Sequence, residues 1–203
     1  MKIYHELQDI KSIATGIKSD GIAIFPVKNG YMLVGLPGMA DKIRKIKKKQ
    51  NRKCLVHVFN KIPSLKQHID ISKISQENFK FLHSTYHLPC INIIPSISYS
   101  EYHDSGETLG VYFVGSNIYE SILSNLIDEP LIATSANISG EKTPYKLEDI
   151  SKDIIDQIDF VFDAGNLPEI EDFCVYNFEN KTFYRDGNKF IKSQILALEN
   201  LSV

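Results

Sequence analysis

The chain has 203 residues, of which 43% are hydrophobic and 24% are charged, and its formal net charge is −2. This composition is typical of a globular protein with a sizeable core, and it excludes general disorder. The three cysteines are widely spaced and odd in number, so we expect neither a disulfide framework nor a metal site. Without a membrane-length apolar run or a signal peptide, we expect a soluble, cytoplasmic protein with no membrane association.

Hydrophobic periodicity predicts alternating helices and strands in the first half of the chain. Residues 5–18 place leucine and isoleucine at three- and four-residue steps, which is typical of an amphipathic helix. The apolar runs 21–27 and 31–36 flank Asn29-Gly30, which predicts two strands joined by a tight turn. The further expected elements are a helix over 39–49 with Ile43 and Ile46 inward, a strand over 55–59 and a helix over 75–87.

The second half continues this alternation. Expected strands cover 91–95, 108–114, 130–135 and 159–163, expected helices cover 117–127 and 146–158, and a closing hairpin joins 174–178 to 181–185. Strands and helices in this order predict an α/β fold with a mixed sheet. We expect one domain over residues 1–203, because neither a linker nor an internal repeat interrupts the pattern.

Basic residues are concentrated in one segment. Eight of them and no acid lie between Lys42 and Lys53, whereas the rest of the chain carries 15 basic and 25 acidic residues. Such a segment indicates contact with phosphate, and it makes RNA a possible partner. A solvated helix face explains the pattern equally well. The segment has no interleaved aromatic residues for stacking on bases, which disfavours specific recognition of single strands.

The string Thr134–Gly140 combines small hydroxyl and amide side chains directly after a predicted buried strand. These groups offer donors and acceptors with little bulk, as a loop around the phosphates or ribose of a nucleotide requires. An ordinary serine- and asparagine-rich turn has the same composition. The spacing is neither that of a Walker loop nor that of a Rossmann fingerprint.

Residues 133–140, ATSANISG, resemble the S-x-N signature of the YrdC-like family, the threonylcarbamoyl-AMP synthases of the TsaC type. The resemblance runs in order along nearly the whole chain. Its further motifs are Pro26–Leu33 against P-T-D-T-V-Y-G-L, Lys47–Lys49 against K-x-R, Lys53–Val58 against a K-P-L-I-V-H-V strand, Gly110–Val114 against G-V-R-V-P, Asp163–Gly165 against D-x-G, and Arg185–Gly187 against R-x-G.

The resemblance implies a single YrdC-like domain, a twisted mixed sheet flanked by helices with a positively lined concave surface. Enzymes of this family condense L-threonine, bicarbonate and ATP to threonylcarbamoyl-AMP and pyrophosphate, for the t6A modification at position 37 of tRNA. Attack on the α-phosphate builds up negative charge, so cationic donors and Mg²⁺ are expected there.

The resemblance also assigns roles to individual residues. They are Lys47 and Lys49 for catalysis on the triphosphate, Ser135, Asn137, Ser139, Thr143 and Arg185 for the nucleotide, and Asn29, Tyr31 and His57 for threonine. For His57, a core histidine with a satisfied hydrogen bond is an equally good interpretation.

Departures from the family pattern are concentrated on the threonine side. Val27 and Asn29 replace threonines, Lys28 replaces an acid, Lys49 and Tyr112 replace arginines, and Asp172-Phe173 replaces a Ser-Thr pair. A lysine does not reproduce the planar, bidentate guanidinium of arginine. Lys28 could restore a cation to the amino-acid pocket, since its motif segment borders that pocket in the family.

Three hypotheses therefore stay open at the level of sequence. The chain is a threonylcarbamoyl-AMP synthase, a paralogue with the same fold and a different small substrate, or a noncatalytic module that binds RNA through residues 42–53. The first two predict ATP binding that raises the melting temperature. The third predicts binding that weakens steeply with salt.

Overall fold

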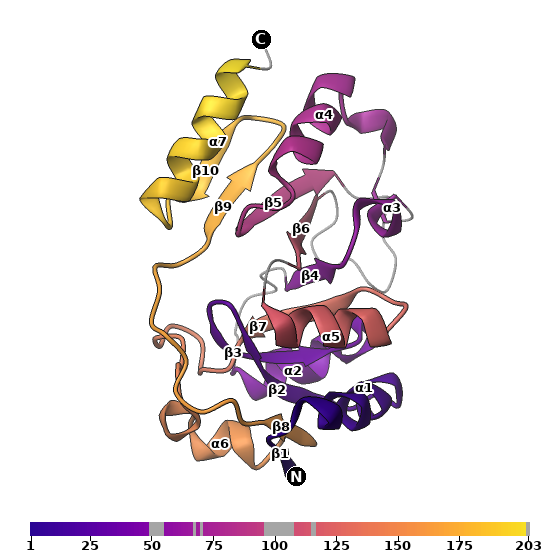
Figure 1. Cartoon of the computed structure of the whole chain (residues 1–203), viewed down its shortest axis with the longest axis vertical. Coiled ribbons are helices and arrows are strands. Elements are labelled where there is room, and N and C mark those ends of the chain that lie inside the picture. The colour runs from indigo at the N-terminus through magenta and orange to yellow at the C-terminus, as the bar shows by residue number, and fades with distance from the viewer. Residues whose placement is uncertain (49–54, 67, 70, 96–107, 115–116, 202–203) are drawn as a thin grey trace.

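The computed structural model describes residues 1–48, 55–66, 68–69, 71–95, 108–114 and 117–201. The strands of these residues form one mixed sheet in the order β1-β8-β2-β3-β7-β4-β6-β5-β9-β10 (Figure 1). Their bounds are β1 Lys2–Tyr4, β2 Ala23–Val27, β3 Gly30–Gly35, β4 Val56–Phe59, β5 Cys90–Pro95, β6 Thr108–Phe113, β7 Leu131–Ser135, β8 Phe160–Phe162, β9 Cys174–Asn177 and β10 Thr182–Arg185. The predicted α/β fold with a mixed sheet flanked by helices is confirmed.

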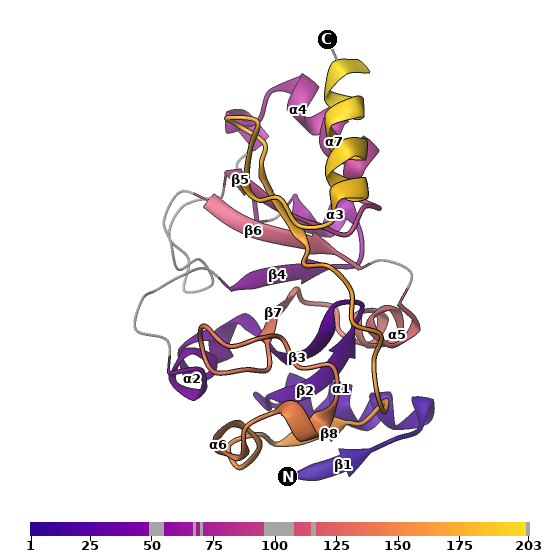
Figure 2. The same ribbon diagram turned by 90° about the vertical axis from the view of Figure 1, so that its left-hand side faces the viewer.

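The described helices lie on both faces of the sheet (Figure 2). They are α1 Ile10–Lys18, α2 Ala40–Ile46, α3 Ile62–Leu65, α4 Gln76–Thr85, α5 Ile118–Leu126, α6 Lys152–Ile155 and α7 Lys189–Leu201, with 3₁₀ turns at Leu7–Asp9, Pro37–Met39, Ile71–Lys73 and Leu147–Asp149. Within the described residues, no helix is both long and apolar enough to cross a membrane.

We call β1, β8, β2, β3 and β7 the lower half of the sheet and the remaining strands the upper half, as they lie in Figure 1. Side-chain alternation along β3 separates the two faces of the lower half. Tyr31 and Leu33 pack with α2 and α6, in a cluster that includes Ile43 and Ile154. The intervening residues, of which Val34 is buried, face α1 and α5. Each face is therefore closed by two helices whose apolar residues pack against the strands.

The upper half of the sheet has a core of its own. Residues of α3, α4 and α7 pack against β5, β6 and β9 in a cluster that includes Leu65, Phe81, Cys174 and Ile195. The segment between β8 and β9 runs from the lower half to the upper half (Figure 1). Residues at the end of this segment can therefore contact both halves.

Several predicted elements need correction. The expected helix over 146–158 is wrong: a 3₁₀ turn ends at Asp149, Ile150 is extended, and α6 begins only after Ser151. Ile150 and Ser151 both have extended backbone angles, which interrupts the helical hydrogen-bond pattern between the 3₁₀ turn and α6. The prediction also lacked β1, α3 and α7, although Ile191, Ile195 and Leu198 have helical spacing and pack together.

The turn between β2 and β3 is formed as predicted but lies one residue earlier. Val27 pairs with Gly30, so Lys28 and Asn29 are the turn residues. Gly30 has φ +108°, and a Cβ there would lie 2.7 Å from the Pro144 carbonyl oxygen. The glycine lets the 143–144 segment pack directly on the start of β3.

Candidate functional site

Two adjoining hollows lie on the described part of the molecule, and the first is open and polar. We call this hollow of about 640 Å³ the outer recess; its lining is Lys47, Thr134, Ser135, Asn137, Ser139, Gly140, Glu141, Lys142, Thr143, Tyr145, Glu169, Ile170, Asp172 and Arg185. Lys47 and all five residues predicted to contact the nucleotide belong to it. Lys49, the other predicted catalytic lysine, lies outside the described residues. The outer recess thus brings together residues that are far apart in the sequence; Lys47 and Arg185 are separated by 138 positions.

Lys47 organises the loop that follows β7. Its ammonium donates to the Ser135 carbonyl oxygen and, at 3.0 Å, to Asn137 Oδ1. In the other direction, the Ser139 N–H of the loop donates to the Lys47 carbonyl oxygen at 3.2 Å. Lys47 is only 4% exposed, because it follows α2, whose inward face is buried. A buried positive charge therefore lies directly beneath the loop that the sequence singled out.

The far end of this loop is held by β3. The Tyr31 N–H donates to the Pro144 carbonyl oxygen at 2.8 Å, and the Ala136 N–H donates to the Tyr31 carbonyl oxygen at 2.9 Å. Asn137 closes the loop internally by donating from Nδ2 to the Glu141 carbonyl oxygen. These bonds fix Ser135 and Thr143, which come from opposite ends of the loop, on the lining of one recess.

Tyr31 supports the site from the opposite face of the sheet. Its hydroxyl donates to the Gly165 carbonyl oxygen at 2.8 Å and accepts from the Ala164 N–H at 2.9 Å. Burial raises the pKa of Tyr31 to about 12. Tyr31 lines neither hollow. It instead ties the first family motif to the D-x-G motif.

Arg185 and Asp172 lie on both hollows. Arg185 Nη1 is 3.9 Å from Asp172 Oδ2, and both side chains are about half exposed. The R-x-G motif requires glycine, since Gly187 has φ +56° and a Cβ there would lie 2.4 Å from the Cys174 backbone nitrogen. This close approach brings the end of β10 to the junction of the two hollows.

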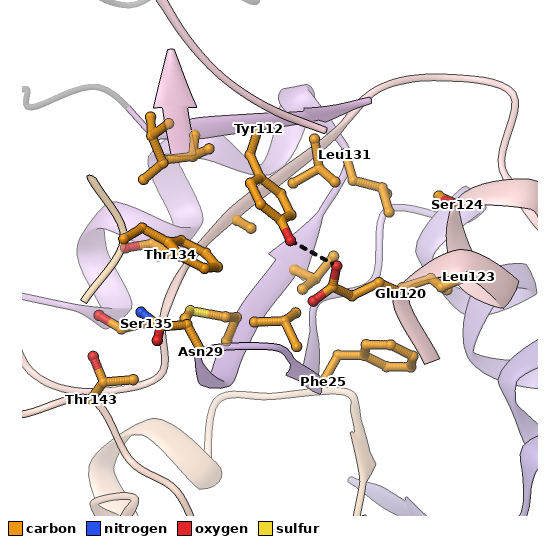
Figure 3. Close-up of a pocket in the computed structure, with 18 of the residues that line it drawn as sticks. Phe25, Asn29, Tyr112, Glu120, Leu123, Ser124, Leu131, Thr134, Ser135 and Thr143 are labelled. Carbon is orange, nitrogen blue, oxygen red and sulfur yellow. Dashed lines mark hydrogen bonds between the residues drawn. The ribbon is translucent and has the colours of Figure 1, made fainter. Parts of the chain in front are cut away.

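The second hollow, which we call the inner cavity, is smaller and mostly apolar. It measures about 300 Å³ and is lined by Phe25, Val27, Asn29, Met32, Val34, Val56, Val58, Ile91, Tyr112, Glu120, Leu123, Ser124, Leu131, Ala133, Thr134, Ser135, Thr143, Asp172, Phe173 and Arg185. Figure 3 shows Ser135 and Thr143 at one side and Glu120, Leu123 and Ser124 at the other. Because Ser135 and Thr143 also line the outer recess, that side is where the two hollows meet.

Five of the residues that depart from the family pattern, Val27, Asn29, Tyr112, Asp172 and Phe173, line the inner cavity. Tyr112 stacks on Phe173 with ring centroids 5.0 Å apart and an interplanar angle of 19°. The Tyr112 hydroxyl donates to Glu120 Oε2 at 3.1 Å, and the Lys28 N–H donates to Oε1 at 2.5 Å. Glu120 is only 5% exposed. The cavity lining therefore holds a stacked aromatic pair and a buried carboxyl group. In the family motifs, an arginine stands at the position of Tyr112 and a small hydroxyl residue at that of Phe173.

The sequence prediction missed Glu120. It is the third residue of α5, after the N-cap residue Asn117, and shares the buried stripe of the helix with Leu123 and Ser124. An acid at a position whose i+3 and i+7 neighbours are Leu123 and Ile127 is unusual for an amphipathic helix. An acid on the apolar stripe of this helix was the sequence signal that could have identified Glu120.

The predicted threonine-side residues lie in different places. Asn29 lines the inner cavity and is 4% exposed, and its Oδ1 accepts no hydrogen bond from any described residue. His57 is buried, and its neighbours Val56 and Val58 line the cavity, so the alternation of β4 directs His57 to the other face. The Lys28 side chain lies in a neighbouring recess with Tyr86 and His87. The cation that Lys28 was expected to restore is thus not among the lining residues of the inner cavity.

Charge in the described site is mixed rather than positive. The outer recess is lined by Lys47, Lys142 and Arg185 and by the acids Glu141, Glu169 and Asp172. In the basic segment, Lys42 lies 3.6 Å from Asp159 and Lys48 lies 2.7 Å from Asp153. The predicted positively lined surface is therefore not shown.

Comparison with known proteins places the fold. The family model for Sua5, YciO and YrdC proteins, described as "Telomere recombination", matches residues 15–187. The chain belongs to the Sua5/YciO/YrdC family. Among curated members, a Methanocaldococcus jannaschii protein provisionally named a threonylcarbamoyl-AMP synthase is 41% identical over 46 residues. That match covers 23% of this chain and 22% of the M. jannaschii protein.

Solved members of the Sua5/YciO/YrdC family share the fold at low identity. P. abyssi Sua5, crystallised with L-threonine, has a TM-score of 0.80 and 18% identity, and the match covers 92% of this chain and 58% of Sua5. E. coli YciO has a TM-score of 0.78 and 15% identity, with 92% of this chain and 95% of YciO covered. The chain thus spans a little over half of Sua5 and nearly all of YciO.

Proposed function

We propose that the protein is an ATP-dependent nucleotidyltransferase of the threonylcarbamoyl-AMP synthase type. It condenses an amino acid, bicarbonate and ATP into a carbamoyl-adenylate and pyrophosphate. The observation that carries the proposal is the junction of a polar recess, organised by Lys47 and the S-x-N loop, with an inner cavity that shares Ser135, Thr143 and Arg185. Two substrates bound in these hollows would meet at that junction.

The proposed chemistry assigns the nucleotide to the outer recess. The amino group of the amino acid forms a carbamate with bicarbonate, releasing water, and a carbamate oxygen attacks the α-phosphorus of ATP. The bond from that phosphorus to the bridging oxygen breaks, and pyrophosphate leaves with the electron pair. The Ser135, Ser139 and Thr143 hydroxyls and Arg185 would stabilise the charge that develops. Lys47 holds this loop in place and adds a buried positive charge beneath it.

Mg²⁺ is expected to arrive with the ATP phosphates. Mg²⁺ commonly binds to substrate phosphates and one or two carboxylates, and Glu141, Glu169 and Asp172 on the outer recess could supply them. Among the described residues, no group of three or more histidine, cysteine, aspartate or glutamate side chains could hold a metal ion. The metal would then neutralise phosphate charge.

With L-threonine as the amino acid, the product would be threonylcarbamoyl-AMP, the precursor of t6A at position 37 of tRNA. L-threonine is the first substrate to test, since the chain belongs to the Sua5/YciO/YrdC family and shares its fold with the threonine complex of Sua5. A cytoplasmic location, where ATP and tRNA are found, is part of this proposal.

A paralogue with a different small substrate is the second candidate. The replacement of arginine by Tyr112 and the stack of Tyr112 on Phe173 favour it, because they change the amino-acid side and leave the S-x-N loop intact. RNA binding through the basic segment is less favoured. Of the five described lysines and arginines there, Lys42, Arg44 and Lys48 have acidic partners in the protein, Lys47 is buried, and Lys45 is exposed.

Pyrophosphate release tests the proposed function. Purified protein is incubated with ATP, Mg²⁺, bicarbonate and L-threonine, each omitted in turn, and then with other amino acids in place of threonine. Release that requires bicarbonate and an amino acid supports the synthase. Its absence with every amino acid, together with a melting temperature that ATP still raises, would leave only the nucleotide-binding half of the proposal.

A further inference from the structure

The lining of the inner cavity is ordered along its length. At the junction with the outer recess lie Asn29, Ser135 and Thr143, and on the opposite side lies Glu120 (Figure 3). The rest of the lining is mostly apolar; it includes Val34, Val58, Leu123, Leu131, Tyr112 and Phe173. A ligand that fills the cavity therefore needs a polar head, an apolar body and a polar tip.

The junction suits the polar head of an amino acid. Arg185 is the only basic residue among the described residues that line the inner cavity, and it also lines the outer recess. A free carboxylate placed deeper would approach the buried Glu120 across apolar walls, where an unpaired charge is costly. The α-carboxylate is therefore best placed beside Arg185, and Asn29 Oδ1 is an acceptor in reach of the cavity for a donor such as the α-amino group.

The opposite end favours a hydrogen-bond donor. Glu120 receives hydrogen bonds from Lys28 and Tyr112, so its carboxyl group is held with a fixed orientation on the cavity lining. A donor at the tip of a side chain would find an oriented acceptor there. An apolar tip would instead desolvate the carboxyl group without a compensating bond.

We propose that the inner cavity binds an amino acid whose side chain is longer and more apolar than that of threonine and ends in a hydrogen-bond donor, which Glu120 receives. The Tyr112–Phe173 stack packs against the apolar stem of that side chain. This inference rests on the proposed function, since it names the substrate class of the same site. Threonine carries its hydroxyl on Cβ, close to its head, and has no long apolar stem to pack on the Tyr112–Phe173 stack.

Matched pairs of amino acids test this selectivity by calorimetric titration. L-tyrosine and L-phenylalanine differ by one hydroxyl, L-lysine and L-norleucine differ by one terminal ammonium, and L-threonine is the reference. The protein is saturated with the α,β-methylene analogue of ATP, which prevents turnover. We expect the donor-bearing member of at least one pair to bind at least about tenfold more tightly than its partner and than threonine, because it adds a hydrogen bond to the oriented Glu120 carboxyl group that the apolar member cannot make. The pair that responds shows whether the tip is neutral or cationic.

Variants connect the preference to Glu120. Glu120→Gln keeps the shape of the side chain, and we expect the ratio within the responding pair to fall below about threefold. Glu129→Gln, an exposed acid beyond the end of the same helix, should leave the ratio unchanged. Thermal melts of each variant establish that it is folded. Tyr112→Phe is a second test of the role of Glu120, because it removes a donor that orients the Glu120 carboxyl group.

The outcomes separate this inference from the proposed function. Threonine binding more tightly than all four other amino acids, or a ratio that Glu120→Gln leaves intact, would overturn the inference. Pyrophosphate release with threonine could still establish the function in that case. Conversely, Glu120-dependent binding of a donor-bearing amino acid without pyrophosphate release would support the inference and overturn the proposed function.

Discussion

The outer recess and the inner cavity share residues of β7 and β10 but are built by different means. The outer recess depends on a loop that Lys47 and backbone hydrogen bonds hold in shape. The inner cavity is a surface of the sheet itself, where alternate residues of β2, β3, β4 and β7 form apolar walls. Lys47 and the predicted nucleotide residues line the first, whereas Val27, Asn29, Tyr112 and Phe173, which depart from the family motifs, line the second. A substitution of Lys47 breaks the hydrogen bonds that hold the loop, whereas a substitution on the sheet surface leaves the backbone hydrogen bonds of the strands in place.

The largest effect is expected from removing the ammonium of Lys47. Lys47→Ala leaves the Ser135 carbonyl oxygen and Asn137 Oδ1 without their charged donor, so we expect a loss of about 2–4 kcal/mol in the free energy of unfolding. ATP should then no longer raise the melting temperature. Lys48→Ala is the matched control, because Lys48 is exposed and its ammonium pairs with the exposed Asp153, and it should leave both quantities nearly unchanged. Equal behaviour of the two variants would contradict the role of Lys47 as the support of the loop.

A methyl group at Gly30 should push the 143–144 segment away from the start of β3. Gly30→Ala combines a φ of +108° with a Cβ only 2.7 Å from both the Pro144 carbonyl oxygen and Thr143 Cγ2. We expect a destabilisation of about 2–3 kcal/mol in chemical denaturation and weaker ATP binding, since Thr143 must move. Gly38→Ala, where the added Cβ meets no atom within 4 Å, should have little effect. Unchanged ATP affinity in a destabilised Gly30→Ala protein would show that Thr143 does not contact the nucleotide.

Tyr31 links stability to pH at the alkaline end. Burial raises its pKa in the folded protein to about 12, above the ordinary value near 10. The contribution of protonated Tyr31 is thus fully present below pH 10 and is lost as the pH rises toward 12, in total about 2–3 kcal/mol. Tyr31→Phe should cost about 1–2 kcal/mol at neutral pH and flatten this pH dependence. The account would be refuted if urea titrations gave the same difference in the free energy of unfolding between the wild type and Tyr31→Phe at every pH from 9 to 11.5.

The smallest effect is expected at the junction. Asp172→Asn removes the acid that lies 3.9 Å from Arg185. Because both side chains are about half exposed, the change in stability should stay below about 1 kcal/mol. Arg185 would then be free to pair with the carboxylate of an amino acid, whose affinity should rise about two- to threefold. Glu171→Gln is the neighbouring control, and an affinity that falls in Asp172→Asn would place the carboxylate elsewhere.

Local sequence patterns determined most of the fold and one side of the site. Apolar periodicity predicted the helices around Ile13, Ile43 and Leu123 and most strands, because burial of one face leaves a repeat of 3.6 or 2 residues in the sequence. The S-x-N string predicted the loop of the outer recess, since its chemistry lies in consecutive residues. The structure places Lys47 and the five predicted nucleotide residues on that recess.

Only the tertiary structure decided what the inner cavity contains. Tyr112, Glu120 and Phe173 come from β6, α5 and the segment before β9. The family motifs point to Tyr112 and Phe173, but no sequence pattern connects either of them with Glu120. The same is true of Tyr31: the family motif assigned it to threonine, but strand alternation turns it to the other face, where it holds Ala164 and Gly165. The physical reason is that packing sets which face a strand presents and which distant side chains share a cavity, whereas a sequence records only the order of its residues.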